Sequence, residues 1–246
     1  MRALPQAIER VLDVQSNAQK PLAVILAGHN GSGKSTLWYQ KLANRLQIPL
    51  INADRMMMSV LPEAGAKETL PAWAVRLRDE DEGWMRVAQK GVQAFVSHAM
   101  GNSVPFAMET VFSHWQARAD GTHESKIDLI RQMKDAGYFV LLIFVGLTDS
   151  ALSIARVQTR IAMGGHAVPV SKLIERFPRT QAAIRQASLV ADATLMVDNS
   201  RAISKAFSVC RVQLQSEVLY DRRMETRKIP SEIDTWLTIV SPTSDN

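Results

Sequence analysis

One segment constrains this chain more than any other. Residues Gly28 to Ser35 read GHNGSGKS, a complete match to the pattern G-x-x-x-x-G-K-[ST]. An apolar run, Leu22 to Ala27, leads into the segment, and a helical pattern, Ser35 to Leu46, follows it. A buried strand that ends in a glycine-rich turn and continues as a helix directs backbone N–H groups at phosphate oxygens. The segment therefore predicts a binding site for a nucleoside triphosphate.

The residue types within this loop indicate their roles. Its glycines permit backbone conformations that a side chain would resist. We expect the Lys34 ammonium to reach the β- and γ-phosphates of ATP, and the Ser35 hydroxyl to bind Mg²⁺. The predicted nucleotide-binding residues are Gly28, His29, Asn30, Gly31, Ser32, Gly33, Lys34, Ser35 and Thr36.

Apolar segments alternate with helical patterns along the rest of the chain. The predicted strands cover 22–27, 48–51, 104–108, 138–145 and 194–197, and the predicted helices cover 4–17, 35–46, 84–99, 124–136, 150–163 and 171–190. This alternation predicts an α/β fold of the P-loop NTPase type, with a mainly parallel five-stranded sheet flanked by helices. The stripe on 84–99 that includes Val87 and Phe95 is expected to lie in the core.

No linker rich in Pro, Gly or Ser divides the 246 residues. The chain is therefore expected to form one domain, 1–246, with its core at about 22–200 and a helical C-terminal extension at 201–246. The acidic run 79–82 is expected to be a solvated surface or a helix N-terminus rather than a metal site.

Composition argues against several other classes of protein. The longest apolar run, 138–145, is far shorter than the roughly 20 residues of a membrane-spanning helix. Glu9 and Asp13 lie where a signal peptide would be apolar, and the one cysteine, Cys210, excludes an internal disulfide. We therefore expect a cytoplasmic protein that does not enter a membrane. The net charge of +5 suits a small anionic ligand; no basic run is interleaved with aromatic residues, so nucleic acid is not expected.

Two acidic positions follow predicted strands. Asp54 comes after strand 48–51, and ligands of such sheets lie at the carboxyl ends of strands. A carboxylate there can accept the proton of an attacking hydroxyl; the alternative is that Asp54 caps the next helix. The strand 104–108 leads into Glu109 and Thr110. Glu109 could hold substrate hydroxyls or orient Mg²⁺ through water.

A third group of candidate residues is basic. Arg156 and Arg160 share a helix face, a Gly164-Gly165 break follows, and a further helix carries Arg176 and Arg179. Cations on a mobile segment that closes over phosphates are typical of a kinase lid. The alternative is a solvated helix that ends at a glycine.

These segments together resemble the zeta-toxin family of P-loop kinases, best known as toxins that phosphorylate UDP-N-acetylglucosamine on a sugar hydroxyl. The matching segments, within about 22–200, are LAGHNGSGKST, INADR, AMETVFS, YFVLLIFVGL, RVQTRIAMGGHAVP and VDNS. The segment R-V-x-x-R…G-G-H-x-V-P, followed by D-N-S, is the most specific of them.

The resemblance implies an ATP-dependent kinase assisted by Mg²⁺. In it, Lys34 and Ser35 would bind ATP and Mg²⁺, Asp54 would be the base, Glu109 and Thr110 would bind the acceptor, and Arg160 would be the first lid arginine. It places Arg156 outside the phosphate contacts. This chain has His166 to Pro169 where well-known toxins place a second lid arginine, so we assign His166 to the acceptor site.

The resemblance favours a UDP-amino sugar as the acceptor, that is, a small anionic molecule. Two alternatives stay open: a kinase of another hydroxylated metabolite, such as a nucleoside or an antibiotic, and a non-catalytic protein whose ATP state gates a partner. Because the sequence shows no antitoxin domain, any antitoxin would be a separate chain.

Overall fold

The computed structural model describes residues 3–63, 70–119, 121, 123–226 and 228–242. Its main sheet contains β1 (Leu22–Gly28), β2 (Leu50–Ile51), β3 (Phe106–Thr110), β6 (Phe139–Gly146), β7 (Ala193–Asp198), β8 (Ser208–Leu214) and β9 (Glu217–Asp221), in the order β2-β3-β1-β6-β7-β8-β9. The strands from β2 to β7 pair in parallel, and β8 and β9 add an antiparallel edge. A separate antiparallel pair joins β4 (Trp115–Ala117) to β5 (His123–Ser125).

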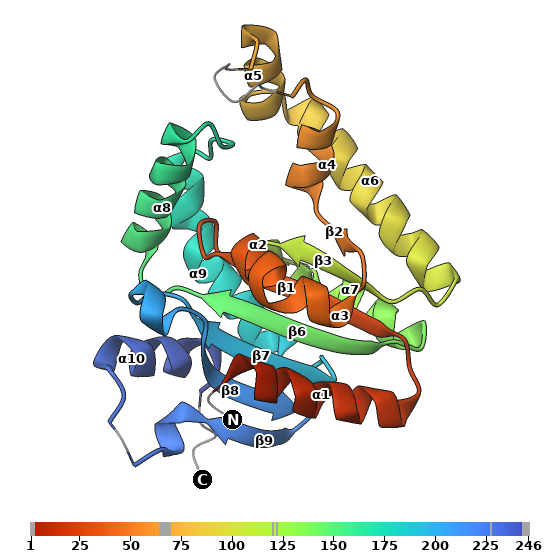
Figure 1. The fold of residues 1–246 in the computed structure, drawn as a ribbon, viewed down its shortest axis with the longest axis vertical. Helices are drawn as coiled ribbons and strands as arrows, with labels where there is room; N and C mark the ends of the chain where they lie inside the picture. The colour runs from red at the N-terminus through yellow and green to blue at the C-terminus, as the bar shows by residue number, and fades with distance from the viewer. Residues whose placement is uncertain (1–2, 64–69, 120, 122, 227, 243–246) are drawn as a thin grey trace.

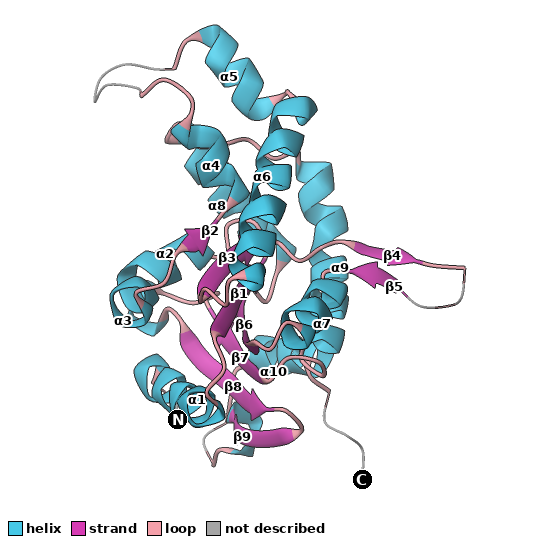
Figure 2. Ribbon diagram, turned by 90° about the vertical axis from the view of Figure 1, so that its right-hand side faces the viewer, coloured by secondary structure: helices cyan, strands magenta, loops and turns pink. Residues whose placement is uncertain are grey.

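Helices cover both faces of this sheet, which gives three layers (Figure 2). The helices are α1 (Leu4–Ala18), α2 (Lys34–Leu37), α3 (Ala43–Leu46), α4 (Ala53–Ser59), α5 (Ala72–Asp79), α6 (Glu82–Gly101), α7 (Ile127–Asp135), α8 (Ser150–Ala162), α9 (Val170–Ala187) and α10 (Ser231–Val240). A π-helical turn, Trp38–Leu42, joins α2 to α3. Helices α1 to α3 lie on one face, whereas α7, α9 and α10 lie on the other (Figure 2).

Two apolar clusters hold the layers together. Alternate residues of β1 point to opposite faces, so Ile25 packs in the cluster with α7, α9 and α10, whereas Val24 packs in the cluster with α1 and α2. Strands β1 and β6 are buried along their whole length, as expected of central parallel strands covered on both sides. The sheet is therefore a rigid platform for the loops at its carboxyl edge.

The predicted fold class is confirmed, and each predicted strand matches an observed strand within two residues at either end. The five-stranded sheet and the helical C-terminal extension were wrong, because β8 and β9 continue the sheet and α10 is the one α-helix described after residue 200. The hairpin turn between them contains Gln215 at φ 50°. Gly or Asn usually marks such a turn, and their absence hid the hairpin.

Two helix predictions also need correction. The helix expected at 124–136 begins at Ile127, because 123–125 forms strand β5. On α6, Val87 and Phe95 are 64% and 59% exposed, so they do not lie in the core. Helix α6 extends beyond the sheet beside α4 (Figure 1), and Val96 and Ala99 make its buried contacts.

Other local expectations hold. Within the acidic run, the Asp81 carboxylate accepts a hydrogen bond from the Trp84 N–H at 2.8 Å and caps α6, as a helix N-terminus requires. Across the described ranges, no helix combines the length and apolar character needed to cross a membrane.

Candidate active site

A cleft of about 1950 Å³ opens at the carboxyl edge of the parallel strands, between α4 to α6 on one side and α8 and α9 on the other. Typical small-molecule sites occupy about 300–1,000 Å³, so this cleft has room for two ligands side by side. The predicted site residues that line it are Asn30, Gly31, Gly33, Lys34, Ser35, Thr36, Asp54, Glu109, Thr110, Arg160 and His166. The other three, Gly28, His29 and Ser32, are buried in the loop behind them.

The phosphate loop is held by close backbone packing. A Cβ atom at Gly28 would lie 2.3 Å from the Val145 carbonyl oxygen, so no other residue fits there. Gly33 has φ 91°, and a Cβ atom on it would lie 2.6 Å from the Asn199 amide nitrogen. That amide donates to the Ser32 carbonyl oxygen at 2.8 Å. The segment Asp198-Asn199-Ser200 therefore supports the phosphate loop through the Asn199 side chain.

Lys34 lies at the floor of the cleft. Its Nζ donates to the carbonyl oxygens of Gly28 and His29, both at 3.0 Å, and lies 3.9 Å from Glu109 Oε1. Burial lowers the pKa of Lys34, and the charges of Glu109 and Asp54 oppose that effect. The charges of Glu109 and Asp54 therefore stabilise the charged form of Lys34, beside the expected position of the phosphates.

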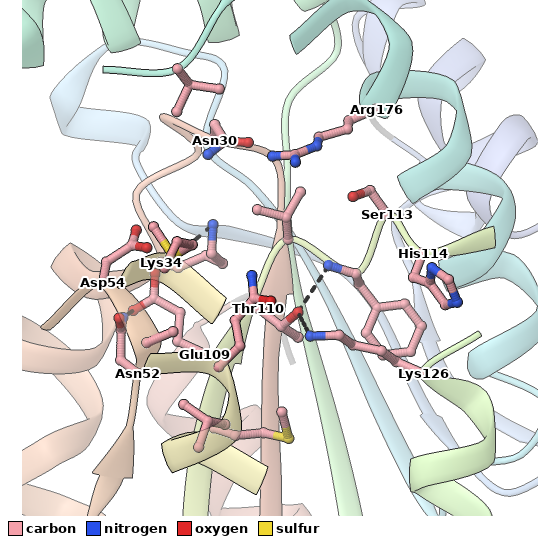
Figure 3. Close-up of a pocket in the computed structure, with 18 of the residues that line it drawn as sticks. Asn30, Lys34, Asn52, Asp54, Glu109, Thr110, Ser113, His114, Lys126 and Arg176 are labelled. Atoms are coloured by element: carbon pink, nitrogen blue, oxygen red, sulfur yellow. Dashed lines mark hydrogen bonds and ion pairs between the residues drawn. The ribbon is translucent and has the colours of Figure 1, made fainter. Parts of the chain in front are cut away.

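Glu109 lines the cleft and contacts the phosphate loop. The Ser35 hydroxyl lies 2.9 and 3.1 Å from its two oxygens, and Asn52 Nδ2 donates to Oε2 at 2.7 Å (Figure 3). Asn52 also caps α4, accepting from the Arg55 N–H at 3.1 Å. The cap is thus Asn52, and Asp54 is left in the first turn of α4 with its carboxylate beside Lys34 (Figure 3).

Asn52 was missed as a site residue, although Asn between a strand and a helix is a capping signal. The oxygen set around it suits a hard cation, because Mg²⁺ prefers hydroxyl, carboxylate and phosphate oxygens. The described residues contain no group of three or more His, Cys, Asp or Glu placed to bind a metal. Ser35 and Glu109 fit Mg²⁺ only if nucleotide phosphates and water supply the remaining ligands.

The two lid arginines differ in their contacts. Arg156 Nη1 lies 3.5 Å from the Gly31 carbonyl oxygen, so Arg156 lies beside the phosphate loop. Burial lowers its pKa, opposed by Asp198. Arg160 Nη2 donates to the His166 carbonyl oxygen at 2.9 Å, and its buried Nε has no partner among the described residues. Arg160 therefore has one buried donor that no described residue satisfies.

The His166 ring contacts α5. Its Nδ1 lies 3.1 Å from Asp79 Oδ1, which also accepts from the Ala167 N–H at 3.1 Å. Arg78 binds the same carboxylate through two nitrogens and donates to the Gly164 carbonyl oxygen at 2.7 Å. Burial alone would raise the pKa of Asp79, but these hydrogen bonds outweigh it and lower the pKa. We call this set, Arg78, Asp79, Gly164, His166 and Ala167, the clasp.

His29 contributes to the loop through its backbone and its packing. Its ring stacks on Phe177, with the ring centroids 3.9 Å apart, and meets the edge of Phe144. Burial, followed by the charge of Lys34, lowers the pKa of His29 to about 3. The ring is therefore neutral at physiological pH and carries no charge to the phosphates.

Thr110 follows Glu109 on β3 and lies beside a lysine that sequence reasoning missed. Its Oγ1 accepts from the Phe112 N–H at 3.1 Å and from Lys126 Nζ at 2.5 Å (Figure 3). Lys126 immediately precedes α7, and Arg176 of α9 reaches into the cleft above it. Nothing local in the sequence marks Lys126, because its partner, Thr110, is on β3.

A phosphate loop at the carboxyl edge of a parallel sheet, with arginines above it and carboxylates beside it, defines a P-loop nucleotide-binding protein. The family model described as Zeta toxin matches residues 7–225, so the chain belongs to the zeta toxin family of P-loop kinases. An uncharacterized protein of Haemophilus influenzae is 28% identical over 145 residues, which are 58% of this chain and 84% of that protein.

Solved structures show the same fold. A chain from the PezAT chromosomal toxin–antitoxin system of Streptococcus pneumoniae superposes with a TM-score of 0.53 at 12% identity, covering 100% of this chain and 91% of that one. A chain of the AvrRxo1-ORF1:-ORF2 complex with ATP superposes with a TM-score of 0.59 at 14% identity, covering 98% of this chain and 71% of that one.

Proposed function

We propose that this protein transfers the γ-phosphoryl group of ATP to a hydroxyl group of a small anionic acceptor, with a UDP-amino sugar as the first choice. One observation carries the proposal: Asp54 and Lys34 lie side by side in a cleft that has room for a second substrate beyond the nucleotide. Membership of the zeta toxin family supports the same reaction class.

Each residue has a role that its surroundings allow. Lys34 leaves the loop carbonyls to bind the β- and γ-phosphates, and Arg160 turns its unsatisfied donor to the transferred group. Asp54 takes the proton of the acceptor hydroxyl while the new O–P bond forms and ADP leaves. When bound, Mg²⁺ would neutralise phosphate charge beside Ser35 and Glu109.

Two further features belong to the proposal. The structural relatives come from two-component complexes, one of them a toxin–antitoxin system, which supports a separate antitoxin chain as a partner. We infer that the protein acts in the cytoplasm, where ATP and nucleotide sugars are present. Two alternatives remain: a kinase of another hydroxylated metabolite, and a protein that binds ATP to gate a partner without turnover. The experiment below distinguishes them.

The test is a metabolite-pool screen by mass spectrometry, with the purified protein, ATP and Mg²⁺. We expect one metabolite to gain a single phosphate, and UDP-N-acetylglucosamine offered alone to stimulate ADP release. The Asp54→Asn protein is the control and should produce neither. If a different metabolite gains the phosphate, the choice of acceptor is wrong, whereas the kinase activity is supported. Tight ATP binding without any phosphorylated product would support the gated protein instead.

A further inference from the structure

A second cavity lies among β8, β9 and the segments that flank them, at the opposite end of the molecule from α4 and α5 (Figure 1). Its volume is about 530 Å³, which is typical of a small-molecule site. None of its described lining residues also lines the main cleft. The charged residues among them are four cations and one carboxylate: Arg201, Lys205, Arg222, Lys228 and Glu225. Such an excess of positive charge around a hollow attracts an anion.

Arg201 brings a hydrogen-bond donor to this cavity that the protein leaves unused. Its side chain is only 17% exposed, and its Nε donates to Asp198 Oδ2 at 2.8 Å. The Nη2 atom is buried and has no partner among the described residues. A buried donor without an acceptor is costly, and a ligand oxygen in the cavity that Arg201 lines would remove that cost.

Arg222 lacks a carboxylate partner. It begins the 3₁₀ turn Arg222–Met224, directly after β9, and contacts the Cys210 thiol of β8. Burial, followed by the charge of Asp198, raises the pKa of Cys210 to about 11, although the charge of Arg222 and its hydrogen bond oppose this. The thiol is therefore neutral at physiological pH and does not balance the guanidinium. Arg222 forms no ion pair with a residue that the structure describes.

Asp198, at the end of β7, lies close to both arginines. It accepts from Arg201, and its charge acts on the Cys210 thiol that Arg222 contacts. Asp198 also pairs in register with Ser208, the first residue of β8, which lines the cavity. Arg201 and Arg222 are thus held beside the same short stretch of β8, 208–210.

The remaining charged groups around the cavity favour an anion. The Glu225 carboxylate accepts from the Tyr220 hydroxyl at 2.7 Å, so the protein already uses it. Lys205 and Lys228 are exposed and form no ion pair with a described residue, so they add positive potential at the opening. Guanidinium groups bind phosphate through paired hydrogen bonds, which makes phosphate the group that fits best.

We propose that Arg201 and Arg222 form a binding site for the phosphate group of a small molecule, separate from the site that holds ATP. The cavity is larger than a phosphate group requires, and Ile229 and Pro230 supply an apolar wall for an organic part. This site goes beyond the proposed kinase reaction and does not depend on it.

The test is calorimetric binding to the full chain, whose main cleft is first filled with the Mg²⁺ complex of a non-hydrolysable ATP analogue. The two probes are inorganic pyrophosphate and adenosine 5′-monophosphate. We expect Arg222→Gln to weaken binding of at least one probe about tenfold, as loss of a charge-assisted hydrogen bond predicts. Arg222→Lys keeps the charge and should retain part of the affinity. Arg10→Gln, which removes an exposed arginine of α1 that lines neither cavity, is the matched control and should bind as wild type does.

The two probes also distinguish the source of the phosphate. Tighter, Arg222-dependent binding of adenosine 5′-monophosphate supports an organic phosphate, whereas tighter binding of pyrophosphate supports an inorganic one. Absence of binding to the loaded wild type would overturn the proposal, because the probes would then compete for the ATP site. Equal affinities in Arg222→Gln and Arg10→Gln would overturn it as well.

A second measurement needs no variant to fold. In the loaded wild type, the bound probe should slow amide hydrogen exchange over 201–209 and 220–226, which form the walls of the second cavity. Exchange over 109–113, in the main cleft, should stay unchanged. Slower exchange in the main cleft alone contradicts the second site, whatever acceptor the kinase uses.

Discussion

Asp54 and Glu109 are two carboxylates in one cleft with different surroundings. Glu109 interacts with the Ser35 hydroxyl and the Asn52 amide, so its lone pairs are committed to the loop side. Asp54 has no hydrogen bond from another described side chain and lies beside Lys34. Different environments commonly separate the roles of paired carboxylates. Asp54 is therefore the better candidate for the base, and Glu109 is the better candidate for a group that supports the phosphates of ATP.

Replacing Asp54 tests that assignment. Asp54→Asn keeps the size of the side chain but removes the proton acceptor, so turnover should fall on the order of 10²–10⁴-fold, while ATP affinity stays nearly unchanged. Steady-state ADP release and calorimetric ATP binding measure the two effects. A comparable loss of ATP affinity would instead assign Asp54 to nucleotide binding.

The two lid arginines should separate in a different way. Arg160 has an unpartnered buried donor, so Arg160→Ala should lower kcat strongly, by about 10³–10⁵ if it stabilises the transferred group as an arginine finger does. Arg156 lies beside the phosphate loop, so Arg156→Ala should weaken ATP binding more than it lowers kcat. Measuring kcat and the KM for ATP in both variants tests these roles. If Arg156→Ala lowers kcat and Arg160→Ala weakens ATP binding, the two roles are exchanged.

At the scale of elements, the phosphate loop and the lid are connected. The Ser153 hydroxyl on α8 donates to the Asn30 carbonyl oxygen at 2.7 Å, so the base of α8 is joined to the loop. At its other end, the clasp joins the α8–α9 segment to α5 through Asp79. Elements from the two sides of the cleft are therefore joined at the clasp.

Neutralising Asp79 should open the clasp. In Asp79→Asn we expect faster amide hydrogen exchange over 160–168, because the carboxylate that bonds the His166 ring and the Ala167 N–H loses its charge. Glu80→Gln is a matched control, since Glu80 is exposed and forms no ion pair with a described residue. Equal exchange in both variants would contradict the clasp.

The same contact gives a pH dependence. The pKa of Asp79 is lowered in the folded protein, so its stabilising effect is complete above the unfolded pKa of about 3.9 and is lost as the pH falls through the folded value. Between pH 7 and about pH 5, Asp79 should therefore cause no acceleration of hydrogen exchange over 160–168, after correction for the intrinsic rate. Faster corrected exchange should begin only below about pH 4.

At the scale of the whole molecule, the C-terminal segment belongs to the core. Trp236 of α10 packs so closely on β6 that a Cβ atom at Gly146 would lie 2.1 Å from it, and its ring stacks near Phe144. Strands β8 and β9 continue the sheet beyond β7, which would otherwise end the sheet as an unpaired edge. The described residues of this segment, 201–226 and 228–242, thus complete the sheet and add a helix that packs on it.

Trp236 provides the stability test. Trp236→Ala should lower the free energy of unfolding by about 3–5 kcal/mol, because a fully buried aromatic leaves a cavity. Ile239→Ala on the same helix is the control, since Ile239 is 45% exposed and should change stability by about 1 kcal/mol or less. Denaturant unfolding followed by circular dichroism measures both. If both variants lower the free energy of unfolding by a similarly small amount, α10 does not contribute to the core.

The sequence by itself determined the phosphate loop, the five parallel strands and the carboxylates that follow them. Each of these depends on neighbours along the chain, or on the rule that parallel strands bring their carboxyl ends to one edge. Only the tertiary structure decided the partners: Asn52 with Glu109 across 57 residues, His166 with Asp79 across 87, and Lys126 with Thr110 across 16. No local pattern encodes such pairs, because their geometry depends on how strands and helices pack in space.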